Sequence, residues 1–97
     1  MSGGYFNYHQ SQIWDIAQEI KELIDNNHDQ TLDEYGYQIG KEYSPKTIEQ
    51  FIKAYDLLKQ SYIYTQRIDW LVSDDDGEDS FHERLKEDLK EIKNEPQ

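Results

Sequence analysis

The chain has 97 residues, no cysteine, and 21 acidic side chains against 10 basic ones, for a net charge of −11. This length supports one small domain with a single core, and without cysteine there are no disulfides and no thiol chemistry. The negative charge disfavours direct binding to nucleic acid, whose phosphates would be repelled. Without a membrane-length apolar stretch or a signal-peptide pattern, we expect a soluble, cytoplasmic protein that does not bind membranes.

A first helix is predicted over residues 9–26. Its apolar residues recur at steps of three and four, which is the spacing of one buried helical face. These residues are Ile13, Ile16, Ala17, Ile20, Leu23 and Ile24. Asn26 and Asn27 suit the end of the helix, because Asn tolerates the left-handed conformation that often follows a last helical turn. Residues 1–7 are expected to form a flexible end.

The next segment, residues 28–43, is predicted as an ordered, Tyr-rich loop that packs across the helices. Tyr35, Tyr37 and Ile39 alternate with glycine and glutamine, a period-two pattern typical of a short extended segment. The chain contains one such run, so no sheet is expected, although a small hairpin remains an alternative.

A second helix is predicted over residues 45–72. Ser44 is a good N-cap, and Pro45 suits the first helical position, where its missing N–H has no cost. One side of this helix carries Ile48, Phe51, Ile52, Tyr55, Leu58 and Tyr62, and the nearly opposite side carries Leu57, Tyr64, Ile68 and Leu71. A helix that is apolar on two sides has to be covered on both. We therefore expect a central helix that its neighbours shield, or a dimer contact along one half of it.

A third helix is predicted over residues 80–94. Ser80 with Glu83 three residues later matches a capping box, and Arg84 lies at the right spacing to pair with Asp88. The apolar stripe of this helix is narrow and its exposed faces are charged. The predicted fold is thus a single all-α domain over residues 1–97, with a long central helix and a second flexible end at residues 95–97.

An acidic run surrounds Gly77 between the second and third predicted helices. If Gly77 takes the sixth position of a calcium-binding loop, Asp74 and Asp76 fall at ligand positions. Glu83 falls at the twelfth, but Val72 stands at the first, where a carboxylate is needed. The favoured interpretation is a solvated turn whose acids favour the N-terminus of the third helix, so no metal site is predicted.

No motif typical of an enzyme is present in the sequence. The three histidines are far apart, and there is no Gly-rich phosphate loop and no nucleophile elbow. A carboxylate pair such as Asp56 and Asp69 would need burial for acid–base chemistry, and the sequence shows no sign of it. A non-catalytic protein without a cofactor is therefore predicted.

The charge pattern indicates a basic partner protein. Residues 73–97 carry ten acidic and four basic side chains, whereas residues 44–72 carry three and four. A Trp beside an acidic run is typical of a contact hot spot, and carboxylates on a helix, about 6 Å apart, can imitate a nucleic-acid backbone. The predicted contact patch consists of Trp70, Asp74, Asp75, Asp76, Glu78, Asp79, Glu83 and Glu87.

The leading hypothesis is therefore an acidic interaction protein that binds and inhibits a basic, nucleic-acid-binding protein. The alternative is a self-assembling helical protein that forms a homodimer or larger bundle through the second helix. A calcium-responsive regulator is a third, less favoured alternative.

Overall fold

The computed structural model describes residues 4–93, and these residues form three helices: α1 (Ser11–Asp25), α2 (Pro45–Val72) and α3 (Glu78–Lys93). The predicted all-α fold with a long central helix is confirmed. The expected flexible ends stay a prediction, since residues 1–3 and 95–97 lie outside the described part of the chain.

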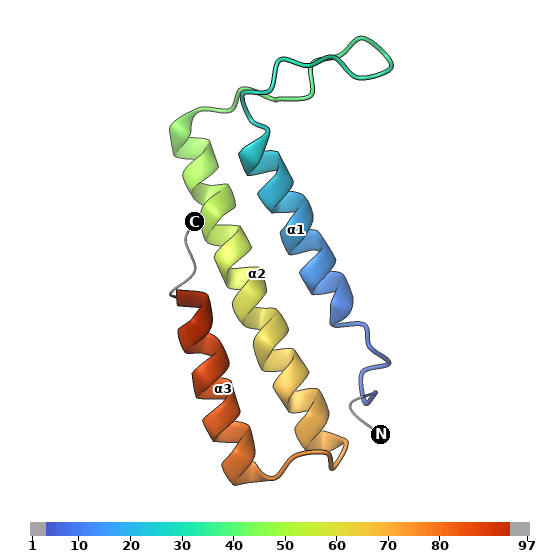
Figure 1. The fold of residues 1–97 in the computed structure, drawn as a ribbon, viewed down its shortest axis with the longest axis vertical. Coiled ribbons are helices and arrows are strands. Elements are labelled where there is room, and N and C mark those ends of the chain that lie inside the picture. Colours follow the sequence, from blue (N-terminus) through green and yellow to red (C-terminus); the bar gives the residue numbers. More distant parts are fainter. Residues whose placement is uncertain (1–3, 94–97) are drawn as a thin grey trace.

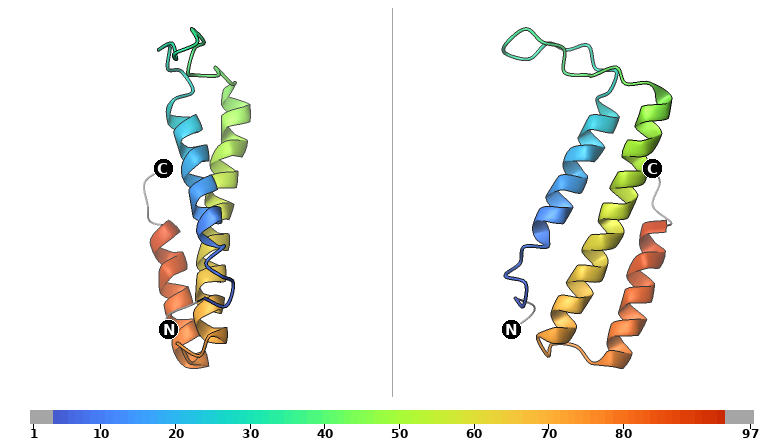
Figure 2. Two further views of the ribbon diagram at one scale, coloured as in Figure 1. Left: turned by 90° about the vertical axis from the view of Figure 1, so that its right-hand side faces the viewer. Right: turned by 180° about the vertical axis from the view of Figure 1, so that it is seen from behind.

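The three helices lie side by side in one layer, with α2 in the middle and antiparallel to both neighbours (Figures 1 and 2). Within residues 4–93, α1 and α3 each contact α2 but do not contact each other. The molecule measures 52 × 27 × 16 Å, and its radius of gyration is 17.1 Å, where a compact domain of this length has about 12.5 Å. Globular domains normally bury apolar side chains between two packed layers, and this chain supplies one.

Few apolar side chains of this layer are fully or almost fully buried, and most of those between the helices are only partly buried. Among the described residues, Ala17 and Ile92 are the only buried members of the apolar core. The buried polar or charged residues are Gln10, Asn27, Lys59 and Asp69. Proteins normally leave charged side chains outside, so the burial of Lys59 and Asp69 is unusual.

Helix α1 agrees with the approximate prediction of 9–26, beginning at Ser11 and ending at Asp25. Asn7 and Tyr8 have left-handed backbone angles, with φ of 54° and 62°. Such angles are incompatible with a right-handed helix, so the segment before Ser11 is a series of turns.

The predicted start of α2 is confirmed, and that of α3 is wrong. The Ser44 side chain accepts a hydrogen bond from the Thr47 N–H, and Pro45 is the first helical residue. In α3 the Phe81 N–H donates to the Gly77 carbonyl at 2.8 Å, so the helix begins at Glu78 and Ser80 lies inside its first turn. The predicted capping box therefore does not form; instead Glu78 and Asp79 occupy the first turn, where the helix dipole favours negative charge. The predicted last residue of this helix, Asn94, lies outside the described residues.

The loop between α1 and α2 projects beyond the end of the helical layer (Figure 1), so the prediction that it packs across the helices is wrong. Tyr35 and Tyr37 are strongly exposed. An isolated antiparallel bridge joins Leu32 and Gln38, and the Asp33 carboxylate accepts hydrogen bonds from the backbone N–H groups of both tyrosines. The segment is a narrow hairpin-like turn without a regular strand.

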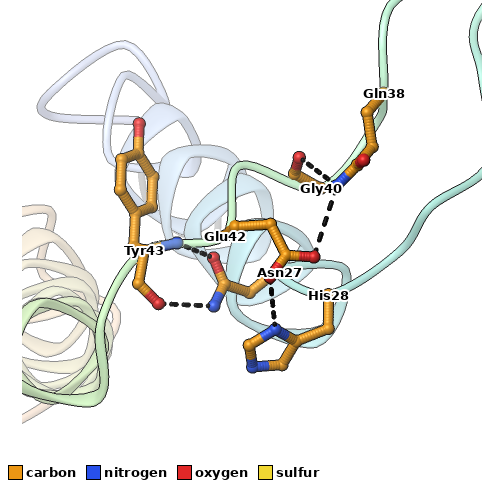
Figure 3. Close-up of polar contacts among 6 residues, drawn as sticks. All are labelled: Asn27, His28, Gln38, Gly40, Glu42 and Tyr43. Atoms are coloured by element: carbon orange, nitrogen blue, oxygen red, sulfur yellow. Dashed lines mark hydrogen bonds and ion pairs between the residues drawn. The ribbon is translucent and has the colours of Figure 1, made fainter.

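Hydrogen bonds hold the base of this loop against the end of α1 (Figure 3). The Asn27 side chain donates to the Tyr43 carbonyl at 3.0 Å and accepts from the Tyr43 N–H at 2.8 Å. Glu42 contacts His28 at 3.2 Å and accepts from Gln38 at 3.3 Å. A Cβ on Gly40 would lie 2.6 Å from the backbone of Asn27, so this close approach requires glycine.

Candidate protein-interaction surface

Two polar contacts join α2 to its neighbours, and they lie within one half of its circumference. The Gln10 side chain, at the start of α1, donates to Asp69 of α2 at 2.8 Å. On the other flank, Arg67 of α2 donates to Asp88 of α3 at 2.7 Å. At about 100° per residue, Asp69 and Arg67 point roughly 160° apart around the helix. The layer is therefore bent at α2, and the convex side of α2 faces away from both neighbours.

Lys46, in the first turn of α2, lies on its convex side, but from Ala54 to Val72 this side is largely exposed and carries no charge. Within about 100° of the helix circumference it presents Ala54, Leu57, Ser61, Tyr64, Thr65, Ile68 and Val72. Leu57 is 55% exposed, Tyr64 44% and Ile68 37%. The prediction that neighbours within the chain shield both apolar sides of this helix is therefore wrong, because the other residues of 4–93 leave these three side chains 37–55% exposed.

Helix α1 extends this exposed area. Ala17 is buried against α2 and Gln10 is hydrogen-bonded to it, so these two residues fix the rotation of α1. Because α1 runs antiparallel to α2, Ile16 and Leu23 then fall on the convex side of the layer, and both are exposed. Beside Leu23, the loop residue Ile39 lines a shallow depression of about 320 Å³. We call the seven convex residues of α2, together with Ile16 and Leu23, the apolar surface.

The opposite side of α2 holds a buried carboxylate. Asp69 is 0% exposed and accepts hydrogen bonds from the backbone N–H groups of Gly4 at 3.1 Å and Tyr5 at 2.7 Å, besides the bond from Gln10. Burial raises the pKa of Asp69, but the hydrogen bonds from Gly4, Gln10 and Tyr5 lower the pKa by more, so it lies below its usual value. Asp69 thus anchors the turns before α1.

A second polar contact joins α2 to α3. The Arg67 guanidinium lies 4.7 Å from the centre of the Trp70 ring and pairs with Asp88 on α3. A planar guanidinium can stack on an aromatic face and bind a carboxylate at the same time. The predicted pair of Arg84 with Asp88 is wrong, because Arg67 takes Asp88 and Arg84 lies 3.8 Å from Asp76 instead.

The structure brings part of the predicted acidic patch together. Asp74, Asp75, Glu78 and Asp79 are exposed at the turn between α2 and α3. The carboxylate of Asp76 points inward, with 4% of its side chain exposed, toward Arg84.

The other three predicted patch residues lie further from this turn. Trp70 is half-buried, and Arg67 lies over its ring. Glu83 and Glu87 are exposed on α3. A contact role for any of these residues stays a prediction.

The acidic turn does not gather the ligands that a metal site requires. Within residues 4–93, no three His, Cys, Asp or Glu side chains form a group that could hold a metal ion. Asp74, Asp76 and Glu83, which align with a calcium-binding loop, therefore do not come together as a ligand cluster. In the same part of the chain, no helix is long and apolar enough to cross a membrane.

Sequence reasoning missed Asp69 and undervalued the side of α2 that carries Leu57. Asp69 lies seven residues after Tyr62, so a carboxylate stands at a position of the buried helical face. That misfit was the available signal of a buried polar anchor. Comparison of the chain with family models, curated proteins and solved structures gives no match.

Proposed function

We propose that this chain is a non-catalytic interaction protein whose function is to bind another protein chain through the apolar surface. The observation that carries the proposal is the exposed side of α2, uncharged from Ala54 to Val72, in a chain where Ala17 and Ile92 are the only apolar residues within 4–93 that are nearly or fully buried. Monomeric proteins rarely leave a contiguous apolar area of this kind open to water. A bound helical surface would supply the second layer that the fold lacks.

The stability of the dilute chain tests this proposal. With so small an apolar core, we expect low stability and a shallow urea transition at high dilution, because unfolding exposes little additional apolar area. Urea unfolding followed by circular dichroism at decreasing protein concentrations measures both quantities. A steep, stable transition that does not change with concentration would show that the single chain is complete, and it would overturn the proposal.

A basic partner at the acidic end of the molecule is a second candidate. It is supported by the four exposed carboxylates of the turn between α2 and α3 and by the exposed Glu83 and Glu87 on the adjoining face of α3. In this hypothesis the acidic end attracts a basic, nucleic-acid-binding protein and inhibits it by occupying the surface that binds phosphates.

Charge reversal tests the second candidate. Asp74→Lys combined with Asp75→Lys and Glu78→Lys should abolish capture of basic proteins from a native lysate at low salt, and raising the salt should do the same to the unchanged chain. The matched control reverses three carboxylates of α1, Asp15, Glu19 and Glu22, and changes the net charge equally. Equal capture by both variants would show that only the net charge matters.

A further inference from the structure

We infer that the apolar surface is the interface of a symmetric homodimer, in which α2 packs antiparallel against α2 of a second copy. This inference rests on the function proposed above and names the partner of the same surface. Four observations carry it: the absence of charge on the surface, the exposed area of the chain, the order of small and large side chains along α2, and the placement of charges at its two ends.

Because the apolar surface carries no charge, a partner that binds it should present an uncharged surface as well. A partner that brought charged side chains onto Leu57, Tyr64 and Ile68 would bury them without a counter-charge, which is costly. The chain itself offers such an occupant in the convex side of α2. Although the chain carries −11 overall, residues 44–72 carry three acidic and four basic side chains, so two copies can meet there without strong repulsion.

The exposed area also fits a dimer. The chain exposes 7342 Å², whereas a folded monomer of 11.7 kDa exposes about 5,900 Å². The excess of about 1,400 Å², to which the projecting loop also contributes, is of the same order as the roughly 1,000–2,500 Å² that each subunit buries in an obligate homodimer. Two stacked copies would form the two-layer arrangement that the single chain lacks.

The order of residues along α2 fits an antiparallel pair. Ala54, Leu57, Ser61, Tyr64, Ile68 and Leu71 follow one another at alternating steps of three and four, the spacing of a helix–helix seam. If a two-fold axis passes between Ser61 and Tyr64, these two residues face each other across the dimer. Leu57 then faces Ile68 of the second copy, and Ala54 faces Leu71. Small side chains thus oppose large ones at the centre and at both ends of the seam.

The charges at the two ends of α2 select the antiparallel direction. Helix α3 lies beside the C-terminal half of α2 (Figure 1), so a parallel pair would place two acidic segments next to each other. An antiparallel pair separates them. It also places Lys46 and Lys53, exposed near the N-terminus of α2, beside the exposed Asp74 and Asp75 of the second copy. This arrangement converts a repulsion into an attraction at each end.

Sedimentation and cysteine cross-linking of the full chain test the inference. We expect a dimer that dissociates on dilution, and Leu57→Lys with Ile68→Lys should weaken it at least about a hundredfold. Because the chain has no cysteine, the variant carrying both Leu57→Cys and Ile68→Cys should oxidise to a covalent dimer. Neither single cysteine variant should form a covalent dimer under oxidation, because its two cysteines lie about 16 Å apart along an antiparallel pair. A chain with Glu83→Cys and Glu87→Cys controls for random collisions.

Each outcome is informative. Cross-linking of the single variants would overturn the antiparallel register, and cross-linking of the control as fast as the double variant would overturn the interface. A chain that stays monomeric and marginally stable at all concentrations would overturn the second copy as occupant but leave the proposed function intact. A stable monomer would overturn both. If the lysine variant fails to fold, the oxidation experiment, which changes exposed positions only, still decides.

Discussion

The two sides of α2 differ in how they place polar and apolar side chains. The side that faces α1 and α3 contains Asp69, which is fully buried, and Arg67, which is paired with α3, whereas the convex side contains the exposed Leu57 and Ile68. The buried polar contacts are directional and require particular partners, so they define how the three helices are arranged. The apolar side chains of the convex side are only partly covered in the single chain, and 37–55% of the area of Leu57, Tyr64 and Ile68 stays available to a partner.

The surface of α3 shows that exposure alone does not explain this difference. Among the described residues, none of the large exposed apolar side chains belongs to α3, whose outer face is made of residues such as Glu83, Lys86, Glu87 and Lys90. A solvated helix face in this protein is thus densely charged, and the convex side of α2 is not. Depletion of charge is the compositional mark of an interface core, which is why we assign the partner to α2.

The largest loss of stability is expected from a substitution of Asp69, on the buried side of α2. Asp69→Ala removes a carboxylate that accepts bonds from Gly4, Tyr5 and Gln10, and it leaves those donors inside the protein. The free energy of unfolding should fall by about 2–3 kcal/mol, since charged hydrogen bonds and stranded donors carry such values. Asp15→Ala, on the exposed side of α1, is the control in urea unfolding. Equal effects of the two changes would show that Asp69 is no anchor.

A smaller loss is expected at the contact between α2 and α3. Arg67→Ala should lower the free energy of unfolding by about 1–2 kcal/mol, because it removes the pair with Asp88 and the stacking on Trp70. The value is below that of a fully buried pair because Asp88 is partly exposed. Lys21→Ala should change stability by less than about 0.5 kcal/mol, since the pair of Lys21 with Asp25 is exposed to solvent. A reversed order of the two effects would contradict this view of the interface.

The pH dependence of stability should carry the signature of Asp69. The folded pKa of Asp69 lies below its usual value, so its contribution is complete above the unfolded pKa of about 3.9 and is lost as the pH falls through the folded value. The difference in stability between the unchanged chain and Asp69→Asn should therefore be constant from neutral pH to about 4 and shrink below it. A difference that grows on acidification would mean that the pKa of Asp69 is raised.

The helices could be predicted from sequence because local signals define them. Steps of three and four located all three helices, and Ser44 with Pro45 defined the start of α2 to the residue. The start of α3 was missed because the sequence offers two possible starts. The capping-box pattern indicates a start at Ser80, whereas Gly77 followed by two acidic residues indicates a start at Glu78, and the structure has the earlier one. The register of a capped helix is therefore ambiguous where two caps lie within one turn.

The arrangement of the helices could not be predicted, because it depends on contacts between distant parts of the chain. The burial of Asp69 follows from donors at Gly4 and Tyr5, more than 60 residues away. Periodicity showed that α2 is apolar on two sides, but it could not show that α1 and α3 both pack on the same half. The sequence therefore predicted the apolar residues of the candidate surface, but only the structure shows that they are exposed.

The smallest change in stability is expected from a substitution on the convex side of α2, measured in the dilute chain. Leu57→Gln removes an apolar side chain that is 55% exposed, so the free energy of unfolding extrapolated to infinite dilution should change by less than about 0.5 kcal/mol. At high concentration the same variant should unfold at clearly lower urea than the unchanged chain, because association stabilises the folded state by mass action. Ala17→Gln, on the buried side, should instead destabilise at every concentration, since Ala17 is fully buried against α2. If Leu57→Gln were as damaging as Ala17→Gln in the dilute chain, the convex side would contribute to the fold of the single chain, and the distinction between the two sides would disappear.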